Sequence, residues 1–266
     1  MIKLLKLDLQ RAIFNKQFSA AILIGVSLSI LAIFKIFYND YVYHGGASGY
    51  YSPFRIWFGN DISSFYPQIF FMIFPILSSI PFANSYWIDK NSGFSKNICT
   101  RCKKINYITS KYIINFIVGG IVVIIPFIVS IYIVFMILPA VKPSVFYTYD
   151  LAKSMFNNLY YSNPYIYIFA YLLIYFMYGG VYASIGLTVS IFSKNKFSSV
   201  AVPSLVYISM YILETLGLPQ LVPSIFFNAM QPVIGININS IIAIFLILFF
   251  ISLLLYIIGV HTDEII

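Results

Sequence analysis

Residue types that usually carry out catalysis or bind metal are sparse in this chain. Its two cysteines, Cys99 and Cys102, form one C-x-x-C pair. A structural zinc site needs about four ligands, and a thioredoxin-like redox site needs a βαβ context. The two histidines, His44 and His261, stand far apart in the sequence. We therefore expect two reduced thiols, a solvated His44, no metal site and no cofactor bound by this chain.

The sequence motifs of several enzyme classes are also missing. The chain contains no nucleotide-binding G-x-x-x-x-G-K-[ST] loop, no H-E-x-x-H metalloprotease motif and no G-x-S-x-G nucleophile elbow. The apolar segments also lack the series of Asp, Glu and Lys residues that relays protons in many ion-coupled carriers. We predict that this chain is not itself an enzyme.

The densest group of charged side chains lies in residues 87–111. This segment holds six of the chain's 16 Lys and Arg residues and one acidic residue, Asp89. The six are Lys90, Lys96, Arg101, Lys103, Lys104 and Lys111. Phe94, Ile98, Cys102 and Ile105 recur at helical spacing, so a helix here would show an apolar stripe beside its basic side chains. Such a helix suits a groove on a partner protein, and the alternative is a basic surface that contacts lipid headgroups.

The composition is that of a membrane protein. Of the 266 residues, 61% are hydrophobic and 9% are charged, whereas roughly 25% are charged in a typical soluble domain. In a soluble protein, the net charge of +8 would suggest a nucleic-acid partner. Here the basic residues flank apolar segments, so the lipid bilayer is the expected partner and nucleic acid is not.

Apolar segments long enough to cross a bilayer recur along the chain. We predict an all-α polytopic membrane protein that forms a single transmembrane domain over residues 1–266. An N-terminal amphipathic interfacial helix is expected at residues 2–15; alternatively, these residues extend the first span inside the cytoplasm. Six transmembrane helices are expected at about residues 17–37, 63–86, 112–138, 165–192, 197–214 and 240–260. Prolines should bend the second span, either as a structural kink or as part of a gate.

The segments between these spans carry further expectations. Residues 39–64 should form an outer loop, and residues 144–159 a short interfacial helix. Residues 217–238 are rich in Pro, Gly and Asn, which predicts a broken re-entrant segment between the fifth and sixth spans. Glu214 precedes this segment, either as a structural residue at the interface or as part of a transport path. Gly179, Gly180, Ala183 and Gly186 predict close helix packing, inside the bundle or across a dimer.

The distribution of basic residues orients these spans. With both termini in the cytoplasm, the cytoplasmic segments hold 12 of the 16 Lys and Arg residues, and the outer segments hold Lys35, Arg55, Lys142 and Lys153. An excess of basic residues on the cytoplasmic side is typical of multi-pass membrane proteins. We therefore expect a multi-pass membrane protein with both termini and residues 87–111 in the cytoplasm.

This layout resembles the membrane subunit of a type-2 ABC exporter of the small bacterial six-helix class. The resemblance covers nearly the whole chain and includes the loop after the second span, which in that family reads D-x-x-x-G-F/T-x-K/E-x-I-x-T-R, followed by basic residues. The matching residues are Asp89, Gly93, Phe94, Lys96, Ile98, Thr100, Arg101, Lys103, Lys104 and Lys111. The family often has an acidic residue at the position of Asn91.

The resemblance implies a division of labour. Residues 91–102 would form a coupling helix on a separate ATPase subunit, which would bind the ATP and Mg. The coupling residues would be Asp89, Asn91, Gly93, Phe94, Lys96, Ile98 and Arg101. Two copies of the chain, or this chain and a homologous permease, would line a translocation path with the first, second and fifth spans.

The path implied by the resemblance would be walled mainly by aromatic side chains. Its candidate residues are Phe70, Phe71, Phe74, Tyr207, Tyr211 and Glu214. Such a wall favours an amphipathic or hydrophobic cargo, and comparable small exporters handle antimicrobial peptides, drugs or lipid-like molecules. The alternatives are a membrane protein that binds a peptide for immunity or sensing without moving it, and an ATP-independent carrier or channel.

Overall fold

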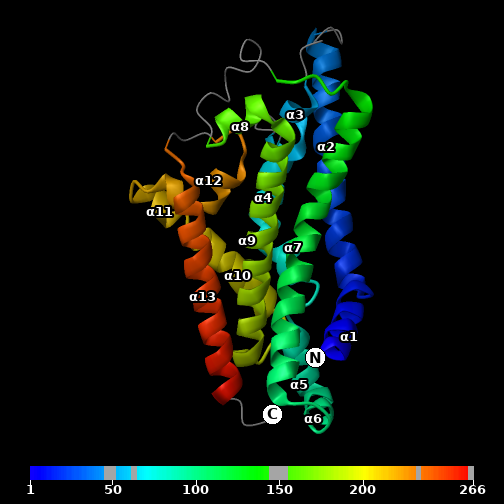
Figure 1. Cartoon of the computed structure of the whole chain (residues 1–266), viewed down its shortest axis with the longest axis vertical. Coiled ribbons are helices and arrows are strands. Elements are labelled where there is room, and N and C mark those ends of the chain that lie inside the picture. Colours follow the sequence, from blue (N-terminus) through cyan, green and yellow to red (C-terminus); the bar gives the residue numbers. More distant parts are fainter. Residues whose placement is uncertain (45–51, 61–64, 144–154, 232–234, 263–266) are drawn as a thin grey trace.

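The computed structural model describes residues 1–44, 52–60, 65–143, 155–231 and 235–262, which form an elongated helical bundle (Figure 1). Within these ranges, four helices are long and apolar enough to cross a membrane. They are α2 (Lys16–His44, of which Lys16–Asn39 is the apolar part), α7 (Lys104–Ile137), α9 (Pro164–Phe192) and α13 (Ile238–Thr262). The structure thus supports the prediction of an all-α membrane protein, with four candidate spans where six were predicted. α2 also continues past residue 37 into the segment expected to be an outer loop.

The second and fifth expected spans form shorter helices. α4 (Phe65–Ser79) has 15 residues and α10 (Ser198–Ser209) has 12, which correspond to about 22 and 18 Å at 1.5 Å per residue. α4 contains Pro75 but ends just before Pro81, because a proline disfavours helical geometry in the preceding residue. The chain restarts in α5 (Ser85–Asn91) and then α6 (Phe94–Cys99). Neither α4 nor α10 alone reaches the roughly 30 Å thickness of a hydrocarbon core.

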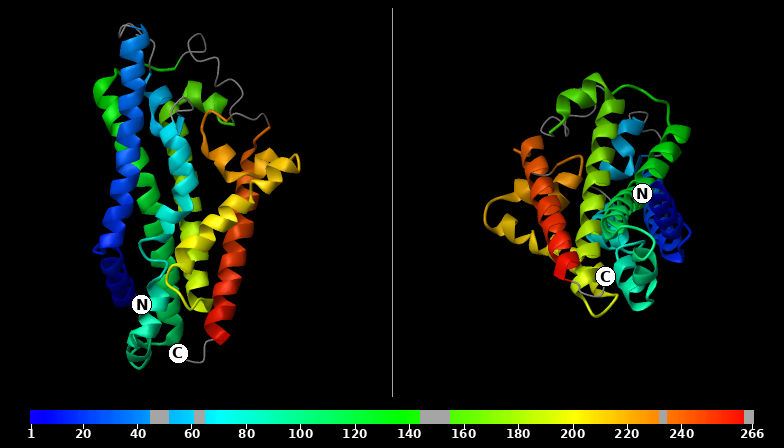
Figure 2. Two further views of the ribbon diagram at one scale, coloured as in Figure 1. Left: turned by 180° about the vertical axis from the view of Figure 1, so that it is seen from behind. Right: turned by 60° about the horizontal axis from the view of Figure 1, so that its bottom comes forward.

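α9 is the central helix, with α7 along one side and α13, α10 and α4 around it (Figures 1 and 2). Small residues permit the close contact between α7 and α9. A Cβ atom added to Gly119 would lie 2.4 Å from Ala183 Cβ and 3.0 Å from the Ser78 carbonyl oxygen. The predicted close packing of the glycine-rich helix therefore occurs within the bundle, as small residues allow backbones to approach.

Part of the expected outer loop is buried in the bundle. Residues 52–60 contain α3 (Pro53–Ile56) and a 3-10 turn, η1 (Phe58–Asn60). Trp57 and Phe58 are buried against α7 and α9, and the Phe58 N–H donates to Ser130 Oγ at 3.0 Å. This part of the predicted outer loop is therefore not a free surface loop, because burial in the core removes the apolar surface of its aromatic residues from water. The interfacial helix expected at residues 144–159 lies mostly outside the described residues; α8 (Asn157–Ser162) begins near its end.

The segment between α10 and α13 is broken into short pieces, as its composition predicts. It contains α11 (Ile212–Thr215), a 3-10 turn, η3 (Pro219–Leu221), and α12 (Pro223–Phe227). α10 ends in tightened turns, where the Met210 and Tyr211 N–H groups bond to carbonyls three residues earlier. The three pieces lie beside the upper part of α13 in Figure 1.

Candidate functional site

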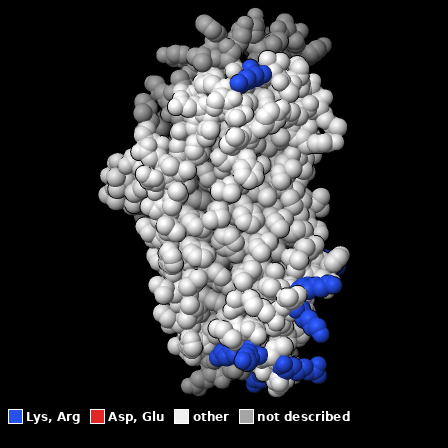
Figure 3. Space-filling view, in the orientation of Figure 1, with Lys and Arg blue, Asp and Glu red and all other residues white. Residues whose placement is uncertain are grey.

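Residues 85–104 form a helical hairpin at one end of the bundle. α5 and α6 are joined at Ser92 and Gly93, and Gly93 has a φ of 72°, a conformation that glycine adopts without steric cost. Figures 1 and 2 place this hairpin at the same end as α1 (Ile2–Ile13) and the last turns of α13. On the face shown in Figure 3, Lys and Arg side chains gather at this end, and the middle of the face is uncharged.

The hairpin exposes part of the predicted coupling set. Asn91, Lys96 and Arg101 are exposed, and Gly93, Phe94 and Ile98 are half-buried. The expected apolar stripe does not lie on one helix, because α6 ends at Cys99 and Ile105 belongs to α7. The break comes at Lys103, whose ψ of 134° is not helical. Ile105 is 64% exposed, so it adds an apolar residue to the basic surface.

Asp89, also predicted to contact a partner, is instead buried within the chain. Its carboxylate accepts two hydrogen bonds from Arg11 of α1, at 3.2 and 2.5 Å, and one from the Tyr107 hydroxyl at 2.9 Å. Lys111 Nζ of α7 lies 2.6 Å from Asp89 Oδ2, and neither of these side chains is exposed. The carboxylate thus joins α1, α5 and α7, and it contributes nothing to the surface of the hairpin.

Asp8 completes this group of side chains, which we call the Asp89 cluster: Asp8, Arg11, Asp89, Tyr107, Ser110 and Lys111. Asp8 is buried, accepts a hydrogen bond from Ser110 Oγ at 2.6 Å and lies 3.8 Å from Arg11 Nη1. Burial by itself would raise the pKa of Asp89, but the Arg11 hydrogen bonds and the Lys111 charge hold that pKa below its usual value. Burial raises the pKa of Asp8, and its weaker partners only reduce this effect.

The cluster changes the role expected of the N-terminal helix. The sequence predicts an amphipathic helix at the membrane interface, but its Asp8 and Arg11 side chains turn toward α7 and α5. Conversely, Ile2 and Phe14 are exposed, at 83% and 85%. Ion pairs and hydrogen bonds offset the cost of burying the charges of Asp8 and Arg11. Polar as well as apolar contacts therefore hold α1 against α5 and α7.

Two further contacts hold the hairpin in place. Arg11 lies 4.6 Å above the centroid of the Phe94 ring at the start of α6, a cation–π arrangement. The Trp87 indole N–H donates to the Lys194 carbonyl oxygen at 3.1 Å, which ties α5 to the turn between α9 and α10. The hairpin is therefore connected to α1, α7 and the α9–α10 turn.

No family model, no curated protein and no solved structure matches the chain. The resemblance to type-2 ABC exporter subunits therefore remains a prediction from the sequence. Within the described ranges, no group of three or more His, Cys, Asp and Glu side chains could hold a metal ion.

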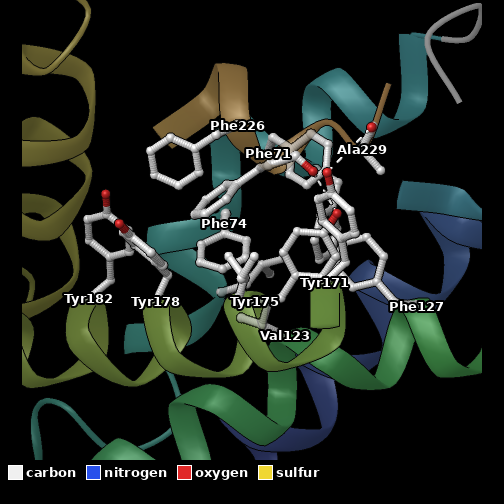
Figure 4. Close-up of a cluster of buried hydrophobic side chains, with 14 of the residues drawn as sticks. Phe71, Phe74, Val123, Phe127, Tyr171, Tyr175, Tyr178, Tyr182, Phe226 and Ala229 are labelled. Carbon is white, nitrogen blue, oxygen red and sulfur yellow. Dashed lines mark hydrogen bonds between the residues drawn. The ribbon is translucent and has the colours of Figure 1, made fainter. Parts of the chain in front are cut away.

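The candidate path residues fall into two groups. Phe70, Phe71, Phe74 and Tyr207 are buried in the core of this chain. They belong to a dense aromatic cluster in which Phe127 stacks on Tyr175 with ring centroids 4.2 Å apart (Figure 4). By contrast, Tyr211 and Glu214 are exposed near the end of α10 and on α11. In this structure only the second group could face a path outside the chain.

A line of tyrosines on α9 bonds to the broken segment. Tyr167 and Tyr171 both donate to the Ala229 carbonyl oxygen, at 3.2 and 3.4 Å, and Tyr175 donates to that of Phe227 at 2.6 Å (Figure 4). Tyr178 donates to the Ile241 carbonyl oxygen at 2.7 Å. The Phe227 carbonyl belongs to the last residue of α12 and the Ala229 carbonyl to irregular backbone, which needs such partners inside a bilayer. Ile241 instead lies in α13, so the Tyr178 bond joins two long helices.

Sequence reasoning missed both the Asp89 cluster and the tyrosine line. Asp8 and Arg11 are three residues apart in the amphipathic helix α1, a spacing that places them on one face. Tyr167, Tyr171, Tyr175, Tyr178 and Tyr182 recur at intervals of three or four residues. Each pattern marks a helix face, but neither identifies the segment that the face contacts.

Proposed function

We propose that this chain is the membrane subunit of an ATP-driven exporter in a bacterial cell membrane, and that the α5–α6 hairpin binds a separate ATPase subunit. One observation carries the proposal. The hairpin presents Lys96 and Arg101 to solvent while the buried Asp89 fixes its other side to α1 and α7. A surface made in this way can receive a partner on one side and transmit its movement to the bundle on the other.

We propose six crossings, with residues 217–238 as a re-entrant segment. α4 and α10 are short alone, so their crossings would include the turns that adjoin them. The support for re-entry is the tyrosine line, because hydroxyl donors from α9 satisfy the carbonyls of Phe227 and Ala229. Both termini would then lie in the cytoplasm with the hairpin, consistent with the distribution of basic residues.

The translocation path would lie between two copies of the chain, or between this chain and a homologous permease. The aromatic core supports this arrangement, because Phe70, Phe71 and Phe74 fill the inside of a single copy. Tyr211 and Glu214, which are exposed, would contribute to the path. The cargo would be amphipathic or hydrophobic, such as an antimicrobial peptide, a drug or a lipid-like molecule, and ATP and Mg would bind the partner.

Thiol labelling tests the orientation. Cys99 and Cys102 are free and half-buried, and burial raises the pKa of the Cys99 thiol, so labelling should be done at mildly alkaline pH. A membrane-impermeant thiol reagent should modify them in inside-out vesicles and leave them unmodified in intact cells. Modification from outside the cell would place the hairpin on the wrong side and overturn the proposal.

Reconstitution tests the function itself. The chain should be purified with the ATPase encoded by a neighbouring reading frame, and ATP hydrolysis and substrate uptake into inverted vesicles should then be measured. Lys96→Glu combined with Arg101→Glu should weaken ATPase binding about tenfold or more. Lys142→Glu, an exposed change beyond the opposite end of α7, is the matched control and should have no effect. Uptake without ATP would indicate a carrier or channel, and peptide binding without uptake an immunity or sensor protein.

A further inference from the structure

Asp8 is held much less firmly than Asp89, although the two carboxylates share one buried cluster. Arg11 donates two hydrogen bonds to Asp89, and Lys111 forms its 2.6 Å ion pair with Asp89. Asp8 has the Ser110 hydroxyl at 2.6 Å and an Arg11 nitrogen at 3.8 Å. Both cations therefore lie closer to Asp89, and Asp8 is buried with a neutral donor as its nearest partner.

Groups on four helices face Asp8. Arg11 lies on its own helix, Asp89 comes from α5, and Tyr107, Ser110 and Lys111 come from α7. Tyr256 of α13, which is also buried, completes the surroundings. Lys111 and Arg11 favour an ionised Asp8, whereas burial and the charge of Asp89 oppose it. Burial is the largest of these effects, and it favours the protonated acid.

We propose that Asp8 is a proton-binding site, whose carboxylate takes up one proton from water when α1 seats against α5 and α7 and releases it when α1 lifts. Arg11, whose side chain is 33% exposed, connects the site to the surface. Proton uptake removes the repulsion between Asp8 and Asp89, and the Ser110 hydroxyl stays within hydrogen-bonding distance. The proposal concerns α1 alone and does not depend on an ATPase partner.

The direction of the pH effect follows from linkage. A carboxyl whose pKa is higher in the seated state binds its proton more tightly there, so proton binding favours seating. This contribution is fully present below the ordinary carboxyl pKa of about 3.9 and is lost as the pH rises through the raised pKa of Asp8. Asp8→Asn imitates the protonated form, because the amide oxygen can still accept the Ser110 hydrogen bond. This variant should keep α1 seated at every pH.

Infrared titration of the full chain in lipid nanodiscs tests the proposal. The wild type should show the C=O band of a protonated carboxyl at pH values above about 3.9, which is the ordinary pKa of an aspartate. The band should be absent in Asp8→Asn and retained in Glu214→Gln, which alters an exposed carboxyl. Hydrogen exchange of the α1 amides, corrected for intrinsic rates, should increase across the same pH range in the wild type and stay constant in Asp8→Asn.

A second variant keeps the proposal testable if Asp8→Asn does not fold. Ser110→Ala removes the neutral donor that stabilises the Asp8 carboxylate, so the midpoint of the band should shift to higher pH. The proposal would be overturned if the wild-type band disappears once the pH reaches the ordinary carboxyl pKa, or if the band survives in Asp8→Asn. An unchanged titration midpoint in Ser110→Ala would also overturn it.

Discussion

Asp89 on α5 and Lys111 on α7 form an ion pair of 2.6 Å in which neither side chain is exposed. Asp89→Asn would remove the carboxylate that pairs directly with the buried Lys111 ammonium, leaving Asp8 as the other acidic group that favours this charge, and would weaken the bonds to Arg11. Breaking a buried pair from one side costs about 3–5 kcal/mol. We expect a clear fall in the thermal unfolding temperature of the purified protein.

The matched controls for this prediction are one exposed change and one double change. Glu214→Gln should leave the unfolding temperature unchanged, because Glu214 is exposed. Asp89→Leu combined with Lys111→Met removes both charges and should be less destabilising than Asp89→Asn, since no charge of the pair is left alone. An Asp89→Asn protein as stable as wild type would contradict the importance of the pair.

The pKa of Asp89 predicts how the pair responds to acid. Because the Arg11 and Lys111 interactions outweigh burial and lower this pKa, the stability that Asp89 contributes is fully present above the ordinary carboxyl value, about 3.9. It is lost as the pH falls through the lowered pKa. Unfolding temperatures measured from pH 7 downward should therefore show a fall in strong acid that is smaller in Asp89→Asn. A fall of the same size in both proteins would assign the acid sensitivity to other carboxyls.

Residues 87–111 illustrate what could be predicted from the sequence. Its basic composition predicts a polar segment between apolar helices, and the structure places a hairpin there. The sequence does not reveal that Asp89 faces inward, because its partners Arg11 and Lys111 lie 78 and 22 positions away. Likewise, the Pro, Gly and Asn residues after Glu214 predict a broken segment. Its attachment to α9 depends on hydrogen bonds between residues more than 50 positions apart.

The lengths of the second and fifth spans could not be predicted from the sequence. Residues 63–86 carry no charge and residues 197–214 carry one only at their last position, Glu214, so hydropathy alone predicts two full spans there. Pro81 ends α4 early, and α10 tightens into turns after Ser209. Residues 52–60 look like loop because they are short and contain Pro and Gly, yet Trp57 and Phe58 are core residues. Local backbone geometry determines where α4 and α10 end, and long-range packing determines that Trp57 and Phe58 are buried. Average hydropathy contains no information about either.

The hydroxyl of Tyr175 should stabilise the broken segment. Tyr175→Phe keeps the ring stacked on Phe127 but removes the 2.6 Å bond to the Phe227 carbonyl, leaving a buried acceptor unsatisfied. A loss of about 1–3 kcal/mol is expected. Limited proteolysis should cut the segment between α10 and α13 faster than in wild type. Tyr132→Phe, at an exposed position on α7, is the control; equal cleavage of the two variants would contradict the role of the hydroxyl.

The contact between α7 and α9 should not tolerate a larger residue at position 119. In Gly119→Ala the new methyl group would lie 2.4 Å from Ala183 Cβ, and backbone atoms on the other sides leave little room for adjustment. Overpacking of this kind costs about 1–3 kcal/mol. The yield of folded, monodisperse protein in detergent should fall, whereas Ala201→Leu, an exposed change on α10, should behave as wild type. Normal behaviour of Gly119→Ala would show that the two helices can separate at little cost.

Photo-crosslinking in living cells tests the central claim most directly. A photoreactive amino acid in place of Asn97, which is exposed on α6, would capture whatever contacts the hairpin. We predict a crosslinked subunit that carries a G-x-x-x-x-G-K-[ST] motif, and loss of this product when Lys96→Glu and Arg101→Glu are added. Crosslinks confined to lipid, or to a partner without a nucleotide-binding motif, would contradict the assignment of the hairpin as an ATPase docking site.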